Sequence, residues 1–335
     1  MRAYEVQPRE GFDSLTLVDR ASPPLGSTDV RVRVRAVSLN YRDLTIARGA
    51  AKRKAPVIPA SDGAGEVIEV GAAVTRHKVG DRVAAAFFPR WIDGAMSEQA
   101  HAVALGGSAD GMLAEEVVLP EPAWVALPGR LSFEAAATLP CAGVTAYHAL
   151  FEATQLRPGD TALVQGTGGV SIFGLQLAKA AGARVIVTSS SAAKRERALA
   201  MGADHVIDYK AEAKWGEAAR AWTGGRGVDV VIEVGGPGTF DQSVAALRYG
   251  GTMSLLGVLT GIKGEIQTYG IFHKGLRVAG VYVGSVAMFE GLIRALEARQ
   301  IDPVIDRTFG FTEARAAYDY LASAQHFGKV VIRVG

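Results

Sequence analysis

Cys141, the only cysteine in the 335 residues of this chain, is the first candidate for chemistry. A lone thiol can attack a substrate, bind a metal or simply fill a core, and its neighbours decide among these three. His148 follows seven residues later, about two helical turns along a helix, so it is not placed for a simple Cys–His pair. The six histidines show no metal-ligand spacing.

A glycine-rich loop, GTGGVS at residues 166–171, is the second candidate. It follows an apolar run, TALVQ, and opens a segment with a helical pattern, so it lies at a strand-to-helix turn. Backbone N–H groups at a helix N-terminus can hold a pyrophosphate, whereas the alternative is a plain tight turn. The third glycine of the full GxGxxG pattern is replaced by Ser171. We expect dinucleotide binding by Gly166, Thr167, Gly168, Gly169 and Val170.

The end of the next strand indicates which dinucleotide this loop would hold. An NAD-specific site usually has Asp or Glu about 20 residues after the loop, to bind the ribose hydroxyls. Here Ser189 and Ser190 stand at about that place, and Lys194 and Arg195 follow. A missing carboxylate with cations nearby suits a 2′-phosphate, so we predict NADP(H). The alternative for the two cations is a solvated helix face.

The elements that must position these residues fall into two regions. Up to about residue 122, short alternating strands such as VRVRVRAVSL (30–39) and GEVIEVG (65–71) predict a small barrel or sandwich. From about residue 130, apolar strands alternate with helices, which predicts a doubly wound parallel sheet. An amphipathic helix at 286–300 and a final strand, FGKVVIRVG, close the chain.

Bulk properties exclude several classes of protein. The length suggests about two domains, and the net charge of +2, without a basic block, argues against a nucleic-acid partner. We find no apolar run of about 18 residues, so no membrane span is expected. A single cysteine cannot form an internal disulfide and fits the reducing cytoplasm, and the N-terminus lacks the apolar region of a signal peptide.

Seven motifs along the chain resemble the medium-chain dehydrogenase/reductase superfamily, in its zinc-independent, quinone oxidoreductase-like branch. The resemblance implies a GroES-like catalytic domain from residues 1–124 and 284–335, with a Rossmann domain at 125–283 and an active site in the cleft between them. It also implies a homodimer paired along the strand LRVAGVYVG. The motifs are SLNYRD (38–43), PASDGAGEVIEVG (59–71), VGDRV (79–83), LPCAGVTAYHAL (139–150), GTGGVS (166–171), GADHVIDY (202–209) and FGKVVI (327–332).

The resemblance also bears on metals. Zinc-dependent relatives have catalytic ligands where this chain has Asn40, Ser61 and Cys141, so two of the three ligand types are absent. Asp62 beside Ser61 is a poor replacement, and one cysteine cannot supply the four that the relatives' structural zinc needs. We therefore expect neither metal, and we interpret Cys141 as a buried small hydrophobe near the cofactor cleft.

Without a metal, hydrogen-bond donors must stabilise the charge that builds on a substrate oxygen during hydride transfer. From the loop that the resemblance places in the cleft, Tyr41 and Asn40 are the candidates, and Tyr41 could also donate a proton or could merely pack. Further cofactor residues implied by the resemblance or by their place at strand ends are Thr145, Tyr209, Gly235, Gly257, Val258, Leu259 and Lys329, the last expected to pair with Asp43 near the pyrophosphate.

These observations predict a zinc-independent, NADP(H)-dependent oxidoreductase. Its substrate would be a quinone, an α,β-unsaturated carbonyl compound, or a ketone or alcohol, with Phe87, Phe88 and Trp91 either lining an apolar pocket or belonging to the core. Two alternatives stay open. One is a zinc-type alcohol dehydrogenase with a non-standard metal site, and the other is a non-enzymatic NADPH-binding sensor or structural protein.

Overall fold

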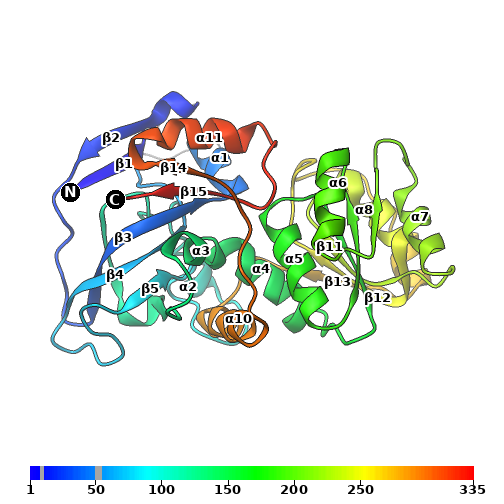
Figure 1. Cartoon of the computed structure of the whole chain (residues 1–335), viewed down its shortest axis with the longest axis horizontal. Helices are drawn as coiled ribbons and strands as arrows, with labels where there is room; N and C mark the ends of the chain where they lie inside the picture. The colour runs from blue at the N-terminus through cyan, green and yellow to red at the C-terminus, as the bar shows by residue number, and fades with distance from the viewer. Residues whose placement is uncertain (8–10, 50–54) are drawn as a thin grey trace. The chain divides into compact units, whose positions relative to one another are not determined.

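The computed structural model describes residues 1–7, 11–49 and 55–335, and its chain divides into two compact units. Residues 1–144 and 283–335 form the first unit, and residues 145–282 form the second (Figure 1). The second unit begins at Thr145 rather than at residue 125, because helix α3 (Phe133–Ala137) packs on strands β3 and β4 of the first unit. No helix within the described ranges is long and apolar enough to cross a membrane.

Strand β3 (Asp29–Leu39) is the centre of the first unit and pairs with β15, β4 and β6. The seven-stranded sheet has the order β14-β15-β3-β4-β5-β7, with β6 on β3, and a separate pair joins β1 to β2. The other bounds are β1 (Arg2–Val6), β2 (Leu15–Asp19), β4 (Asp62–Val70), β5 (Arg82–Ala85), β6 (Glu116–Pro120), β7 (Trp124–Ala126), β14 (Ile305–Gly310), β15 (Lys329–Arg333), α1 (Tyr41–Ala47), α2 (Glu98–His101), α10 (Val286–Arg299) and α11 (Ala314–Ala322).

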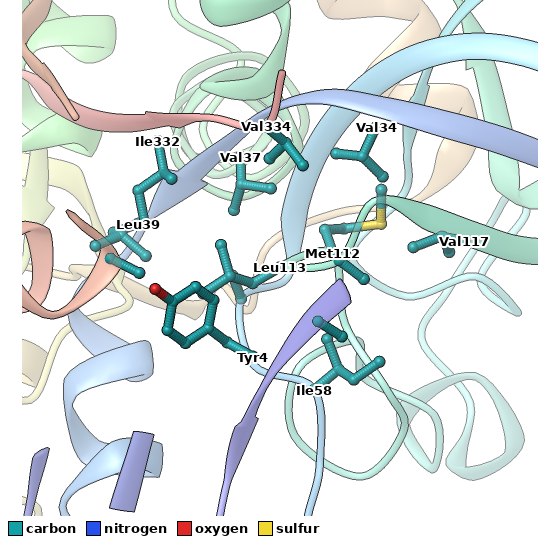
Figure 2. Packing of buried hydrophobic residues seen from close by; sticks show 14 of the residues in the cluster. Tyr4, Val34, Val37, Leu39, Ile58, Met112, Leu113, Val117, Ile332 and Val334 are labelled. Carbon is teal, nitrogen blue, oxygen red and sulfur yellow. The ribbon is translucent and has the colours of Figure 1, made fainter. Parts of the chain in front are cut away.

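The core of this unit lies on the inner face of β3. The alternation of its sequence places Val30, Val32 and Val34 in the interior, where all three are fully buried. Figure 2 shows Val34 and Leu39 of this strand in one cluster with Met112 and Ile332, the latter from the C-terminal strand β15. Residues from both ends of the chain therefore share one core.

The second unit contains a six-stranded sheet in which every pairing is parallel. Its order is β10-β9-β8-β11-β12-β13, so the chain reverses its direction of travel across the sheet between β8 and β11. The bounds are β8 (Thr161–Gln165), β9 (Arg184–Thr188), β10 (His205–Ile207), β11 (Val228–Glu233), β12 (Leu247–Leu255), β13 (Arg277–Gly280), α4 (Val144–Tyr147), α5 (Gly169–Ala180), α6 (Ala192–Ala200), α7 (Trp215–Trp222), α8 (Pro237–Ala246) and α9 (Tyr269–His273).

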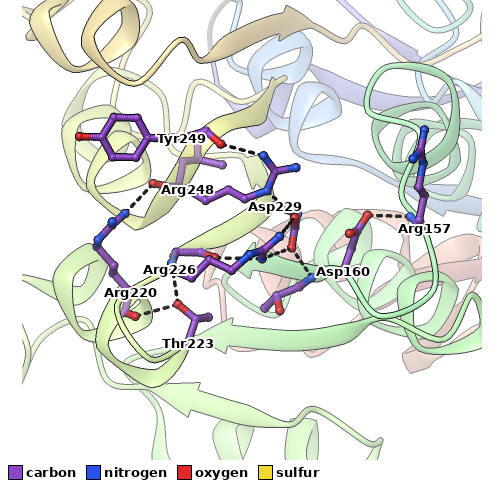
Figure 3. Close-up of polar contacts among 11 residues, drawn as sticks. Arg157, Asp160, Arg220, Thr223, Arg226, Asp229, Arg248 and Tyr249 are labelled. Atoms are coloured by element: carbon purple, nitrogen blue, oxygen red, sulfur yellow. Dashed lines mark hydrogen bonds and ion pairs between the residues drawn. The ribbon is translucent and has the colours of Figure 1, made fainter.

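Asp229 fastens β11 to β8 at the amino end of the sheet (Figure 3). Its carboxylate accepts hydrogen bonds from the Thr161 N–H at 2.9 Å, from both Nη atoms of Arg226 and from Nε of Arg248. Burial alone would raise the pKa of Asp229, but these hydrogen bonds outweigh it and hold the pKa at about 2. The opposite, carboxyl end of the same two strands is where doubly wound sheets bind ligands.

Candidate functional site

The start of helix α1 positions both predicted catalytic residues. Asn40 has the extended backbone of an N-cap residue, and its N–H donates to the Asp43 carboxylate at 2.8 Å. This contact fixes the first turn, in which Tyr41 is the first helical residue. The side chain of Tyr41 is 45% exposed, whereas Asn40 is buried.

Lys329 is the cation of this part of the first unit. Strand β15 pairs with β3 so that Val330 lies opposite Leu39, which brings Lys329 to the start of α1. Its buried ammonium donates to Leu39 O at 2.7 Å and to Asn40 Oδ1. Lys329 thus contacts Asn40 directly. We expected it to pair with Asp43, and its positive charge is close enough to lower the pKa of that carboxyl.

Two carboxylates are buried beside this ammonium. Burial raises the pKa of Asp43 to about 6, although the Arg42 guanidinium acts strongly in the opposite direction. Burial also raises the pKa of Asp62, and the Lys329 ammonium is the largest of the influences that oppose this rise. Arg42 is therefore the main cation that acts on Asp43, and Lys329 is the main cation that acts on Asp62.

Asp62, at the start of β4, links several predicted positions. Its carboxylate accepts from Ser61 Oγ at 2.6 Å and from the Cys141 N–H at 3.1 Å. The Asn40 amide also lowers the pKa of Asp62. The oxygen of Asn40 accepts from the Lys329 ammonium, whereas its buried amide nitrogen has no hydrogen-bond partner among the described residues.

The donor set at this place does not fit zinc. Two of the three positions where zinc-dependent relatives have ligands carry Asn40 and Ser61, which are not the Cys, His, Asp or Glu types that a catalytic zinc needs. The Lys329 ammonium already binds the oxygen of Asn40. Among the described residues, no three His, Cys, Asp or Glu side chains are grouped to hold a metal. As a whole residue, Cys141 is half-buried, whereas we expected a buried small hydrophobe.

The aromatic residues of the segment after β5 belong to the core. Phe87, Phe88 and Trp91 are all buried, and the rings of Phe87 and Phe88 pack edge to face at 4.6 Å. The guanidinium of Arg42 stacks over Phe87 at 4.5 Å and donates to Leu105 O at 2.8 Å. These contacts support the core interpretation of the three aromatic side chains.

The glycine-rich loop lies at the carboxyl end of β8, as predicted. Gly166 has a φ of +71°, which favours glycine, and its N–H donates to Thr188 O of β9. A β-carbon added at Gly166 or Gly168 would meet no atom within 4 Å, so the loop leaves open space beside helix α5. Ser171 departs from the glycine pattern because its buried hydroxyl donates to Gln165 O at 2.6 Å, inside the turn. The loop and the first turn of α5 fit a dinucleotide phosphate.

The carboxyl end of β9 carries the predicted ribose-side residues. Ser189 and Ser190 follow the strand, and Ser191 caps α6 by accepting from the Lys194 N–H. Arg195 donates to Ser189 O and forms an ion pair with Asp208, both at 2.8 Å. Tyr209, next to Asp208, is 42% exposed. Ser190 and Lys194 thus follow β9, Tyr209 follows the neighbouring strand β10, and Arg195 is paired with Asp208.

The carboxyl ends of β11 and β12 hold the remaining predicted positions. The Thr260 N–H donates to Gly235 O, and the Leu259 N–H approaches Val234 O at 3.4 Å, so the two strand-end loops are tied together. Val258 and Leu259 are exposed, whereas Thr145 of α4 is buried.

Sequence reasoning missed two polar residues in this region, Gln165 and Glu233, which end β8 and β11. Each is a polar residue at the end of a largely apolar strand, and this pattern could have marked both as candidates from the sequence.

Comparison with known proteins decides the family. Residues 26–129 match the alcohol dehydrogenase GroES-like domain, and residues 169–298 match the zinc-binding dehydrogenase family. A zinc-type alcohol dehydrogenase-like protein of Schizosaccharomyces pombe is 43% identical over 97% of this chain and 96% of its own length. The chain belongs to the medium-chain dehydrogenase/reductase superfamily.

Other members of this superfamily agree with that assignment. A quinone oxidoreductase of Pseudomonas aeruginosa is 32% identical over 92% of this chain and 91% of its own length. The crystal structure of a Sinorhizobium meliloti 1021 protein, described as an alcohol dehydrogenase, superposes with a TM-score of 0.93 at 43% identity, covering 99% of this chain and 98% of that one. This medium-chain dehydrogenase/reductase is therefore an oxidoreductase with a GroES-like domain and a Rossmann-type parallel sheet.

Solved relatives have been described with more than one nicotinamide cofactor. A mycobacterial protein complexed with NADPH has a TM-score of 0.83 at 28% identity, with full coverage of both chains. An NAD-dependent alcohol dehydrogenase has a TM-score of 0.91 at 32% identity, also with full coverage of both chains. Members of the superfamily use nicotinamide cofactors, and these two differ in which one.

Proposed function

We propose that this protein is a zinc-independent, NADP(H)-dependent reductase of a quinone, an α,β-unsaturated carbonyl compound, or a ketone or its alcohol. The observation that carries the proposal is the buried Lys329 ammonium on Asn40 Oδ1, at a position where zinc-dependent relatives have a metal ligand. A positive charge is thus built into the chain at that place. One cysteine suits the reducing cytoplasm, where we expect the enzyme to work.

The preference for NADP(H) rests on the end of β9. Three serines, residues 189–191, follow the strand at the place where an NAD-specific site has an acid that binds the ribose hydroxyls. Asp208, at the end of β10, is neutralised by its ion pair with Arg195 at 2.8 Å. Lys194, in the first turn of α6, is the cation that we assign to the 2′-phosphate.

The two predicted catalytic residues take different roles in this proposal. In the reducing direction a bound nicotinamide would supply the hydride, and negative charge would develop on the substrate oxygen; in the oxidising direction the same site would take the proton from the alcohol. Tyr41 is exposed at the first position of α1, and we assign its hydroxyl as the hydrogen-bond and proton donor. Asn40 is buried, its oxygen accepts from Lys329 and its N–H donates to Asp43, so we assign it the positioning of the first turn.

Titration of tryptophan fluorescence with NADPH and NADH tests the cofactor. We expect NADPH to bind at least about tenfold more tightly, a difference of about 1.4 kcal/mol, and Lys194→Ala to erase the gap. Lys214→Ala, which removes an exposed lysine elsewhere in the second unit, is the matched control and should keep the preference. Equal affinities in the wild-type protein would overturn the NADP(H) assignment.

Metal content and turnover separate the alternatives. We expect no stoichiometric zinc by elemental analysis and undiminished NADPH-dependent turnover in the presence of a chelator. One zinc per chain with chelator-sensitive turnover would favour the zinc-type alcohol dehydrogenase. Tight NADPH binding without turnover over a broad panel of quinones, enones, ketones and aldehydes would favour the non-enzymatic sensor or structural protein.

We also propose a homodimer formed along β13. This strand is the edge of the six-stranded sheet, and an unpaired edge can add a strand from a second copy. Large side chains are exposed near it in the sequence, including Tyr269, Phe272 and Tyr282. Light scattering should give twice the mass of one chain, and Val278→Pro, which removes a ladder N–H from β13, should give the monomer. A monomeric wild-type protein would refute this.

A further inference from the structure

A buried amide and a buried carboxylate face each other across the switch point of the second unit. Gln165 is the last residue of β8 and Glu233 the last residue of β11, and these strands are neighbours. Gln165 Nε2 donates to Glu233 Oε2 at 2.6 Å. Both side chains are almost inaccessible to solvent. In open α/β sheets, ligands bind outside the strand ends at this same place.

The Glu233 carboxylate organises the loop that follows β11. Its Oε1 accepts from the N–H groups of Gly235 and Gly236 at 2.7 and 2.9 Å, and from Thr239 Oγ1 at 2.5 Å. Its Oε2 accepts from Gln165 and from Ser243 Oγ. Five donors therefore converge on one side chain. A carboxylate, which accepts at both oxygens, satisfies all of them.

Gln165 links that loop to the glycine-rich loop. Its Oε1 accepts from the N–H groups of Val234 and Gly235, both at 3.2 Å. Its backbone carbonyl accepts from Ser171 Oγ at the start of α5. One residue thus contacts both loops that we assign to the cofactor, on either side of the switch point.

The loop after β11 cannot relax independently of the loop after β12. Gly236 has a φ of +90°, and a β-carbon on Gly257 would lie 1.7 Å from Val234 O. The Thr260 hydroxyl also donates to Gly235 O at 2.8 Å. The Gly235 carbonyl is therefore bonded directly to the loop at residues 257–260, through both the N–H and the hydroxyl of Thr260.

We propose that Gln165 and Glu233 are positioning residues for the dinucleotide, fixing the loops at the ends of β8, β11 and β12 as one unit. The proposal rests on the nicotinamide cofactor of the proposed function. Gln165 and Glu233 are not needed merely to hold β8 and β11 together, because the Thr161 N–H of β8 already donates to Asp229 of β11 at the amino end of these strands. The pair's distinct effect is to set which way the loop peptides face.

The Glu233→Gln variant tests the proposal, because the amide has only one oxygen to accept with. Its NH2 group would face donors such as the Gly235 N–H, with which it cannot form a hydrogen bond. We expect cofactor Kd to rise at least about tenfold, the effect of losing one buried hydrogen bond to a charged group. We also expect the kinetic isotope effect measured with 4-deuterated NADPH to change, which altered hydride geometry would produce and lost stability alone would not. Gln165→Glu combined with Glu233→Gln exchanges the two groups and should recover most of the affinity.

Asp229→Asn is the matched control, since it removes a buried carboxylate from the other end of β11. We expect it to lower the unfolding temperature while leaving cofactor Kd within about twofold, because it lies outside the loops. If Glu233→Gln does not fold, Thr239→Val, which removes one donor to Glu233, is measured in its place and should raise Kd in the same direction.

The outcomes separate this inference from the proposed function. Wild-type protein that binds NADPH or NADH, with unchanged Kd and isotope effect in a folded Glu233→Gln or Thr239→Val variant, overturns the positioning role alone. The positioning role is also overturned if cofactor affinity falls in proportion to stability, and does so in Asp229→Asn as much as in Glu233→Gln. A wild-type protein that binds neither cofactor overturns both proposals.

Discussion

Replacing Lys329 with Met should destabilise the first unit in a strongly pH-dependent way. The substitution keeps the length of the side chain and removes the ammonium that donates to Leu39 O and Asn40 Oδ1. It leaves Asp43 and Asp62, both fully buried, without that positive charge. Breaking a buried charge cluster by removing one partner typically costs about 3–5 kcal/mol.

Burial raises the pKa of both Asp43 and Asp62, so the effect of removing Lys329 should depend on pH. Raising the pKa of Asp43 from 3.8 to about 6 means that ionised Asp43 already costs the folded protein about 3 kcal/mol, at 1.36 kcal/mol per pH unit. The folded protein holds this proton where the unfolded chain has released it, so the stability of the fold increases as pH falls through about 6. Without Lys329, both carboxylates should take up protons at still higher pH. The loss should therefore be about 3–5 kcal/mol at pH 8 and clearly smaller at pH 5.5.

Urea unfolding followed by tryptophan fluorescence at the two pH values measures this loss. Trp124 of β7 is a fully buried probe in the same unit. Asp62→Asn added to Lys329→Met removes one unpaired acid and should recover part of the stability at pH 8. Lys179→Met, which breaks a partly exposed ion pair with Asp204, should cost less than about 1 kcal/mol at either pH. The reasoning would be refuted if Lys329→Met lost the same stability at both pH values. It would also be refuted if the stability losses of the two single variants simply added up in the double variant.

Three further substitutions have defined outcomes. Tyr41→Phe should lower kcat about 100-fold or more with cofactor Kd unchanged, measured by steady-state kinetics and titration, and near-normal kcat would reduce Tyr41 to a packing role. Ser171→Gly completes the glycine pattern but loses the bond to Gln165 O, so thermal unfolding should show a destabilisation of about 1 kcal/mol, and a more stable variant would contradict this. Because the pKa of Asp229 is about 2 in the folded protein, this carboxylate stabilises the fold by about 2 kcal/mol above pH 4, and the stabilisation is lost as pH falls from about 4 to 2. Asp229→Asn should therefore lower the free energy of unfolding in urea by an amount that shrinks over that pH range. A loss that stays constant with pH would contradict this linkage.

Local patterns in the sequence predicted the elements well. The alternating β3 sequence, the amphipathic helix at 286–300 and the glycine turn before α5 each depend on interactions within a few residues, and the structure contains all three. The helix is α10, and Ser285 caps it by accepting from the Met288 N–H.

The contacts that define the candidate site could not be predicted in this way. Lys329 and Asn40 lie 289 residues apart in the chain, and only the pairing of β15 with β3 brings them together. Gln165 and Glu233 are 68 residues apart, and their contact follows from the strand order across the switch point. The boundary at Thr145 also depends on which sheet α3 packs against.

The place of β15 in the sheet has a consequence for biosynthesis. This strand, only a few residues from the C-terminus, lies between β14 and β3, and it brings Lys329 to helix α1. A ribosome therefore releases all of the second unit before the first unit can close its sheet. Strand β3 must wait for β15 through the synthesis of about 290 residues, since β3 ends at Leu39 and β15 begins at Lys329. Strands β4 and β6 can pair with β3 much earlier, so the part of β3 that waits for its neighbour is residues 36–39, which pair with β15.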